Sequence, residues 1–171
     1  MPKGSDVYAQ HIHRLDRPVS GVVLFAKQRA VLKNLSEQFA GRKVKKFYQA
    51  FTEQMPASAK GRLEHWHRKE KKKAVLYDKE VPYAEKATLE YEVVPISSGR
   101  FVWTIELHTG KYHQIRAQLA SVGCPIIGDI VYGSTLPYKT DAIALCAWKL
   151  IFFHPVTNES IIVITRLNIS I

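Results

Sequence analysis

Hydrophobic and polar residues alternate over several short stretches of this chain, with the period of two that is typical of strands. The clearest stretch is 101–107, where every second residue is large and apolar, so these side chains would share one face of a sheet. An unbroken apolar run at 22–26, followed by Lys27, is typical of a strand covered on both faces. Similar patterns predict strands over 45–52, 88–94, 142–150 and 160–165.

Two further stretches carry apolar residues at helical spacing. Residues 28–40 are predicted to form a helix that ends at Gly41. Its apolar stripe consists of Leu32, Leu35 and Phe39. Residues 112–122 are predicted to form a second helix, in which His113 and Arg116 face a different side from the apolar stripe. That stripe consists of Ile115, Leu119 and Val122.

The remaining segments are connections without a clear period. We expect a loop around Pro56, a hairpin or a mobile loop over 62–80, and a turn at 97–100. Residues 1–10 are predicted to form a flexible N-terminal segment, and residues 11–171 a single folded domain. Several strands, few helices and no regular alternation of the two predict an α+β fold.

Composition narrows the class of protein. A chain of 171 residues suits one domain, which would bury roughly 70% of its unfolded surface. No apolar run approaches the roughly 20 residues of a membrane-spanning helix, and the N-terminus lacks the apolar core of a secretory signal. The two cysteines are too few for a disulfide framework. We therefore expect a cytoplasmic protein that does not enter a membrane.

The charge points to a polyanionic partner. The formal net charge is +10, and a field of that size favours nucleic acid first and an acidic membrane surface second. Cations are concentrated at 42–46 and 68–73, and aromatic residues flank both clusters. This combination is typical of binding to unpaired RNA, although the second cluster could equally be a solvated surface.

Other chemistries find little support in the sequence. Two His-x-His pairs, at 11–13 and 65–67, lack the further ligands that a zinc site takes. Ser20 is not framed as a nucleophile elbow, and no phosphate-binding loop of the Gly-x-x-x-x-Gly-Lys type occurs. We therefore predict no metal and no hydrolytic serine.

One carboxylate stands out by its setting. Asp16 lies between Arg14 and Arg17, in a stretch rich in turn formers that leads into the apolar run at 22–26. The two arginines would favour its ionised form. A surface turn residue paired with an arginine explains the same local pattern.

The motif His13-Arg14-Leu15-Asp16, followed by Ser20-Gly21, resembles the catalytic motif of the pseudouridine synthases of the RluA type. Further segments match the family in order and spacing from about residue 11 to residue 165. They are Lys46-Phe47-Tyr48-Gln49-Ala50, Gly110-Lys111-Tyr112-His113-Gln114-Ile115-Arg116, Gly128-Asp129, Tyr132-Gly133 and His154-Pro155. The resemblance implies a mixed, mostly antiparallel central sheet with flanking helices.

The resemblance also implies the roles of the site residues. Asp16 would be the catalytic aspartate, Arg116 its ionic partner, and Tyr48 the aromatic residue beside the target base. Arg14 would fill the place that the target uridine leaves in the RNA. The other residues expected at the RNA are Lys27, Lys46, His113 and Gln114, of which the last two would shape the cleft and Lys27 could simply be exposed. The reaction isomerises uridine in ribosomal or transfer RNA to pseudouridine and consumes no cofactor.

The chain departs from the family pattern at several places. Val19 stands where a threonine is usual, and Lys111 replaces a common arginine. The family's N-terminal Lys-Pro-x-Gly turn has no counterpart before His11, and the chain also lacks an S4-like RNA-binding domain. We therefore expect an N-terminally shortened catalytic domain, whose exposed sheet edge a partner protein could cover.

Two alternatives to a self-sufficient enzyme remain open. A non-catalytic RNA-binding protein could retain the same fold, although pure binding does not require a buried anion facing a polyanion. A synthase that needs a partner would be active in extract but not as the pure protein.

Overall fold

The computed structural model describes residues 8–96 and 99–165. It contains an eight-stranded sheet in the order β10-β9-β4-β8-β7-β5-β6, with β2 pairing to β9 beside β10. All neighbours are antiparallel except β2 and β9, which are parallel. The strands are β2 (Ser20–Gly21), β4 (Lys45–Thr52), β5 (Lys60–Glu70), β6 (Lys73–Tyr77), β7 (Glu85–Ile96), β8 (Arg100–Leu107), β9 (Leu145–Phe153) and β10 (Ser160–Ile164). The expected mixed, mostly antiparallel α+β architecture is confirmed.

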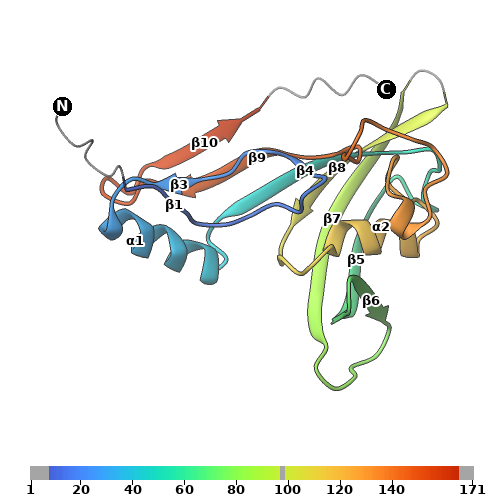
Figure 1. The fold of residues 1–171 in the computed structure, drawn as a ribbon, viewed down its shortest axis with the longest axis horizontal. Coiled ribbons are helices and arrows are strands. Elements are labelled where there is room, and N and C mark those ends of the chain that lie inside the picture. Colours follow the sequence, from blue (N-terminus) through green and yellow to red (C-terminus); the bar gives the residue numbers. More distant parts are fainter. Residues whose placement is uncertain (1–7, 97–98, 166–171) are drawn as a thin grey trace, which may run out of the picture.

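Two helices and a small second sheet complete the fold. In Figure 1 α1 (Arg29–Ala40) and α2 (Gln114–Ser121) lie below the sheet, α1 toward β10 and α2 beside β7 and β5. The second sheet pairs β1 (Gln10–His11) with β3 (Phe25–Ala26). A short 3-10 helix, η1 (Ile130–Tyr132), lies in the long connection between α2 and β9.

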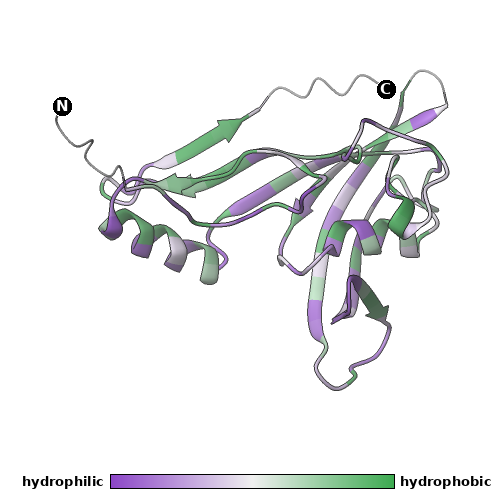
Figure 2. Cartoon of the chain, in the orientation of Figure 1, coloured by the Kyte–Doolittle hydropathy of each residue, from purple (hydrophilic) through white to green (hydrophobic). Residues whose placement is uncertain are grey.

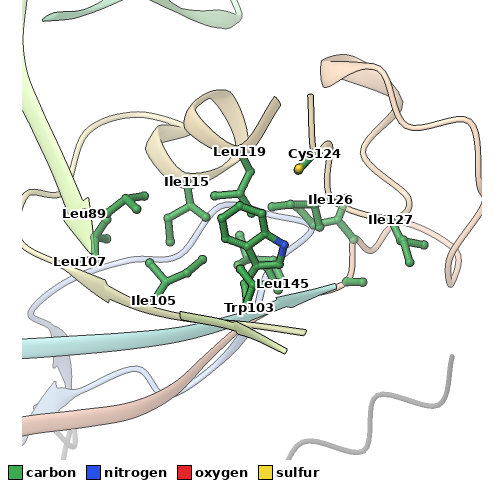
Figure 3. Packing of buried hydrophobic residues seen from close by; sticks show 14 residues of the cluster. Leu89, Trp103, Ile105, Leu107, Ile115, Leu119, Cys124, Ile126, Ile127 and Leu145 are labelled. Atoms are coloured by element: carbon green, nitrogen blue, oxygen red, sulfur yellow. The ribbon is translucent and has the colours of Figure 1, made fainter. Parts of the chain in front are cut away.

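The main core lies between the sheet and α2. Trp103 of β8 is fully buried at its centre, and its ring lies under Leu119 and Ile115 of α2 (Figure 3). The indole nitrogen Nε1 donates a hydrogen bond of 2.8 Å to the hydroxyl of Thr52, so the one polar atom of this ring is satisfied inside the core. Alternation along β8 therefore supplies the apolar face that carries α2, as the pattern over 101–107 predicts.

A second, smaller core lies between α1 and the β9–β10 end of the sheet. Leu35 of α1 packs there with Leu150 and Phe152 of β9. The side chain of Gln38 is buried beside them and both accepts from and donates to the backbone of Phe153, at 2.9 and 2.8 Å. In Figure 2 apolar and polar residues alternate around α1 accordingly, and the predicted helix over 28–40 is confirmed.

Several other expectations agree with the structure. The predicted strand over 45–52 coincides with β4, and the strand predicted over 88–94 is the middle of the longer β7. Of the two alternatives for 62–80, the hairpin is observed, as β5 and β6. In the predicted turn at 97–100, Ser97 and Ser98 lie outside the described residues, as do residues 1–7 of the expected flexible segment. Gln10, in that same segment, is paired in β1.

The expected buried strand over 22–26 is wrong. Ser20–Gly21 forms β2 instead, the chain then leaves the sheet, and only Phe25–Ala26 pairs again, as β3. Val22 and Leu24 pack against the α1 core, whereas Phe25 is 60% exposed. Apolar composition here reflects contact with α1 rather than burial on both faces of a sheet.

Two other boundaries also differ from the predictions. Residues 142–144 precede β9 because the backbone N–H groups of Ile143 and Ala144 bind the carbonyls of Pro18 and Ile127 rather than a neighbouring strand. Helix α2 begins at Gln114 rather than at residue 112. Arg116 faces Asp129 and not the apolar stripe, as expected, but this side is also buried, since Arg116 is only 5% exposed. Among the described residues, no helix is long and apolar enough to span a membrane.

Candidate active site

The loop that carries Asp16 is closed at its base. Pairing of β1 with β3 is continued by a hydrogen bond of 3.1 Å from the N–H of Ile12 to the carbonyl of Leu24. The N–H of Leu24 in turn donates to Nε2 of His13, at 3.2 Å. Inside the loop, the N–H of Val19 donates to the carbonyl of Asp16, which forms a tight turn. The Asp16 turn is thus held by backbone contacts on both sides.

Glycine is required where this loop meets the sheet. Gly21 has φ +131°, and a Cβ added there would lie 2.3 Å from the carbonyl oxygen of Ala147. The close approach allows β2 to pair with β9, since no larger residue could enter the space. This requirement explains the glycine of the Ser20-Gly21 pair in physical terms.

His13 acts as an acceptor within the protein. Burial, with smaller effects of Lys46 and His11, lowers the pKa of His13 to about 4. Its ring stacks on Phe39 of α1, with the centroids 4.8 Å apart. A neutral imidazole can accept the N–H of Leu24, and a protonated one cannot. His13 therefore binds the N–H of Leu24 only in its neutral form, while its ring contact with Phe39 joins the Asp16 loop to α1.

Asp16 lies at a cavity of about 380 Å³ between α1, β4 and the start of α2. Its side chain is 29% exposed, and its Oδ2 is 3.8 Å from Nη1 of Arg116 and 3.8 Å from Nε2 of His113. In the part of the chain that the structure describes, no donor hydrogen-bonds to this carboxylate. Asp16 thus presents an accessible carboxylate near the guanidinium of Arg116 and the imidazole of His113.

Arg116 is bound most tightly to a residue other than Asp16. Its Nε and Nη2 donate to the two carboxylate oxygens of Asp129, at 2.6 and 2.8 Å, and Asp129 is only 1% exposed. The ring of Tyr132 lies 5.1 Å from the guanidinium carbon. Burial by itself would lower the pKa of Arg116, but the hydrogen bonds and charge of Asp129 raise it. The expected pairing of Arg116 with Asp16 is therefore a longer contact, beside a bidentate pair.

His113 is fixed at the start of α2 in a left-handed conformation, with φ 51°. Burial and the charge of Arg116 lower its pKa, which favours a neutral ring. The hydroxyl of Tyr132 accepts the N–H of Ala74 and lies 3.1 Å from Nδ1 of His113. If that hydroxyl donates to Nδ1, the imidazole proton is on Nε2, the nitrogen nearer Asp16.

Tyr48 reaches the same cavity from β4. Burial, followed by the charge of Asp16, raises the pKa of Tyr48 to about 12, so its phenol keeps its proton at neutral pH. The pairing of β4 with β9 shifts register between Phe47 and Tyr48, and such irregularities often redirect a side chain next to a site.

The structure brings together four of the five expected RNA-binding residues. Arg14, Lys46, His113 and Gln114 line the Asp16 cavity, while Lys27 lines a different one with Leu24, Phe25 and residues of α1 and β10. Arg14 is exposed, and burial together with Arg42 lowers the pKa of Lys46.

Gln114 is committed to the protein interior. Its Oε1 accepts from the hydroxyl of Thr109 and the N–H of Lys111, and its Nε2 donates to the carbonyl of Thr88 and to Gln118. With its amide fully hydrogen-bonded, this side chain fixes the loop before α2.

Sequence reasoning assigned no role to Asp129, Tyr132 or His13. The pairs Gly128-Asp129 and Tyr132-Gly133 matched the family pattern, and this was the available sign that Asp129 and Tyr132 belong to the site. Nothing in the spacing indicated that Asp129 would bind Arg116.

His13, His65 and His67, three of the four histidines that raised the question of a metal, are engaged in other contacts. Nε2 of His67 donates to the carbonyl of Tyr112, at 2.7 Å, and Nδ1 of His65 accepts from Gln118, at 3.1 Å. Across residues 8–96 and 99–165, no three metal-ligating side chains are grouped together.

Known proteins are similar to this chain in sequence and in fold. The family model described as RNA pseudouridylate synthase matches residues 2–121. An uncharacterized RNA pseudouridine synthase of Aquifex aeolicus is 31% identical over 86% of this chain and 50% of its own length. The dual-specificity RNA pseudouridine synthase RluA of Escherichia coli is 34% identical over 89% of this chain and 70% of its own length.

A solved structure agrees with the architecture. Human RNA Pseudouridylate Synthase Domain Containing 4 superposes with a TM-score of 0.76 at 23% identity, over 93% of this chain and 71% of that one. The chain spans about half the length of several curated relatives that it matches. With a family model that covers most of the chain and an arrangement of strands that this relative shares, the chain belongs to the RluA-type RNA pseudouridine synthase family.

Proposed function

We propose that this protein isomerises uridine in RNA to pseudouridine and that Asp16 is its catalytic residue. The observation that carries the proposal is the position of the Asp16 carboxylate, which is accessible in a cavity between Tyr48 and Arg116. Accessibility alone would not single out this carboxylate, but Arg116, which is buried, and Tyr48, which is partly buried, line the same cavity. Membership of the family supports the same reaction.

The reaction requires a group that acts at the sugar or the base. The bond between C1′ and N1 of the uridine breaks, the uracil turns, and a new bond joins C1′ to C5. N1 gains a proton and the proton of C5 is released to solvent, so the reaction is balanced without a co-reactant. A carboxylate can act in it as a nucleophile or as an anionic stabiliser, and Asp16 is placed to do either.

Asp16 is proposed to act through its carboxylate. Arg116 and His113 lie 3.8 Å from its Oδ2, and the guanidinium of Arg116 places a positive charge beside this carboxylate. Because Arg116 also donates two hydrogen bonds to Asp129, its position does not depend on Asp16. The guanidinium is thus a fixed charge beside a carboxylate that is free to contact substrate.

Tyr48 is proposed to pack beside the target base. Its phenol is protonated at neutral pH, since its pKa is raised to about 12. It can therefore offer a ring face and a neutral hydroxyl, and a uracil that has left the RNA stack needs both a surface and a hydrogen-bonding partner. Arg14, exposed at the mouth of the cavity, is proposed to occupy the space that the uridine vacates.

The substrate is proposed to be ribosomal or transfer RNA. Relatives are named Ribosomal large subunit pseudouridine synthase C, in Buchnera aphidicola, and tRNA pseudouridine synthase C, in Vibrio parahaemolyticus. Mapping uridine isomerisation across cellular RNA with and without the gene would identify the site. We also propose that the protein is cytoplasmic and that a partner protein covers its N-terminal side.

Release of tritium from RNA labelled at C5 of uridine tests the reaction. The protein is expected to release tritium, and Asp16→Asn is expected to abolish release while RNA affinity stays within a few-fold. The matched control is Asp141→Asn, which changes an exposed carboxylate on a neighbouring loop and should leave release intact. Circular dichroism checks that both variants fold.

Other results would contradict parts of the proposal. Full release by Asp16→Asn would remove Asp16 from the chemistry. RNA binding without release on any cellular RNA would favour a non-catalytic binding protein, and release in extract but not by the pure protein would favour a synthase that needs a partner.

A further inference from the structure

The loop between β6 and β7 displays a tyrosine that is almost completely exposed. Tyr83 is 94% exposed, and it lies in the loop at the end of the arm formed by β5, β6 and the first residues of β7 (Figure 1). Single exposed aromatic residues are common, so exposure alone does not indicate a function. The backbone conformation of Tyr83 and the charged residues around it do point to a function.

The backbone of Tyr83 is strained. The N–H of Ala84 donates to the carbonyl of Val81, at 3.1 Å, and closes a turn with Pro82 and Tyr83 at its centre. Tyr83 has φ +64°, a conformation that favours glycine or asparagine at this place in a turn. Arg68 holds the turn by donating to the carbonyl of Pro82. The turn thus holds a large ring in water through a conformation that is unfavourable for tyrosine.

The ring borders a second cavity next to the Asp16 cavity. This cavity, of about 470 Å³, is lined by Tyr83, by the cations Arg68, Lys69 and Lys111, and by the carboxylate of Glu85. Gly110 and Lys111 line both cavities. The two cavities are therefore neighbouring parts of one surface. Cations outnumber carboxylates in the lining of the cavity at Tyr83.

Tyr83 differs from the other tyrosine of this cavity. The ring of Tyr112 stacks on His113, with the centroids 3.8 Å apart, and the ammonium of Lys69 lies 4.6 Å from its centre. Within the described part of the chain, Tyr83 has no ring or cation partner. Of the two tyrosines, Tyr83 is the one whose ring is available to a ligand.

We propose that Tyr83 is a stacking platform for an unpaired base of the RNA strand that flanks the target uridine. This inference rests on the proposed function. A strand that enters the Asp16 cavity would pass Gly110 and Lys111 and place its phosphates near the lining cations, with a neighbouring base on the Tyr83 ring. An aromatic ring next to cations is the usual arrangement for single-stranded RNA, and the contact accepts any base.

Two substitutions at the same position separate stacking from structure. Tyr83→Asn removes the ring but suits a positive φ, so the melting temperature should not fall. Tyr83→Phe keeps the ring and loses only the hydroxyl. Binding of the full chain to a short fluorescein-labelled oligouridylate should weaken about tenfold in Tyr83→Asn, as expected for one stacked base, and stay within twofold in Tyr83→Phe.

An abasic oligomer of the same length provides the internal control. It keeps the phosphates but has no bases, so the wild-type protein and Tyr83→Asn should bind it equally. Equal affinity of the two proteins for the oligouridylate would overturn the proposal, and so would a difference that persists on the abasic oligomer.

The proposed function and this inference can fail separately. If the wild-type protein releases tritium and Tyr83→Asn has the same KM for RNA, the stacking platform is wrong and the enzyme stands. If the wild-type protein releases no tritium but Tyr83→Asn lowers the affinity for the oligouridylate, the platform stands and the activity is wrong.

Discussion

The two sides of the Asp16 cavity are built differently. On the α2 side, Arg116 and Asp129 are 5% and 1% exposed and share two short hydrogen bonds. On the loop side, Asp16 is 29% exposed and its neighbours Arg14 and Arg17 reach solvent. The α2 side is fixed by buried polar contacts, and the loop side by a few hydrogen bonds at its base.

From this difference we expect a rigid α2 side and a more adaptable loop side. A charge that is buried and paired cannot move without a large cost, so the guanidinium of Arg116 is placed before any RNA arrives. A loop with few buried contacts opens at a lower free energy than the core, so Arg14 and Asp16 can adjust to a nucleotide that enters. The expected effects of substitutions on the two sides should therefore differ in size and in kind.

The largest expected loss of stability is on the α2 side. Asp129→Asn leaves the guanidinium of Arg116 buried without its bidentate carboxylate, and breaking a buried pair in this way costs about 3–5 kcal/mol. The melting temperature should fall by roughly 10 °C for a chain of this size. Urea unfolding followed by circular dichroism measures the loss in the free energy of unfolding.

Glu85→Gln is the matched control for that substitution. The carboxylate of Glu85 also binds a cation, Lys111, but its side chain is 69% exposed, so the free energy of unfolding should change by no more than about 0.5 kcal/mol. Equal losses for the two variants would contradict the contrast between the sides.

The next largest effect is expected where the loop meets the sheet. A methyl group at Gly21 would lie 2.3 Å from the oxygen of Ala147, at φ +131°, so Gly21→Ala should cost about 2–3 kcal/mol. Because β2 would move away from β9, the Asp16 turn should shift, and tritium release should fall more than RNA affinity does.

Gly123→Ala separates the clash from the backbone conformation. Gly123 also has a positive φ, +75°, but a Cβ there meets nothing within 4 Å. It should cost only about 1 kcal/mol and leave tritium release unchanged. If Gly123→Ala were as damaging as Gly21→Ala, the close contact with Ala147 would not be what fixes the loop.

The two sides also differ in how far the sequence predicts them. Alternation identified β8, since this strand buries one face against the main core. The family motifs grouped Asp16, Tyr48 and Arg116, and these three residues line one cavity. The polar contacts of α2 were not predictable, because Arg116 binds a residue 13 positions away through a loop whose path depends on the whole fold. Helical periodicity assigns polar residues to solvent, and α2 buries them.

The run at 22–26 shows a different error, in which burial was in part predicted correctly but the structure was not. Its apolar residues do reflect burial, but burial does not specify a partner, and Val22 and Leu24 contact the α1 core instead of adjacent strands. A period of two or 3.6 can be read only where one element has one buried face. The Asp16 loop crosses from one core to the other and therefore has neither period.

The stability of the loop side should depend on pH. His13 has a folded-state pKa of about 4, below its ordinary value of 6.5. The unfolded chain therefore takes up a proton before the folded one does, and stability is lost as the pH falls from about 6.5 to about 4. Allowing for the partial exposure of the ring, the loss should be about 1–2 kcal/mol.

His13→Gln isolates this contribution. The glutamine amide oxygen can still accept the N–H of Leu24 but does not titrate. Between about pH 7 and about pH 4.5, the free energy of unfolding should fall less in His13→Gln than in the wild-type protein. Identical pH profiles would show that the His13 contact does not hold the loop.

The smallest effect is expected at the outer rim of the loop side. Arg17 and Asp141 form an ion pair of 3.3 Å, with side chains 87% and 75% exposed. Solvent and salt screen such a pair, so Asp141→Asn should change the free energy of unfolding by less than about 0.5 kcal/mol and leave tritium release unchanged. Urea unfolding at low and high salt should give the same small difference from the wild-type protein, or one that shrinks as salt is added. A loss above 1 kcal/mol that salt removes would mean that surface charge, rather than the hydrogen bond to His13 and the fit of Gly21, holds the Asp16 loop in place.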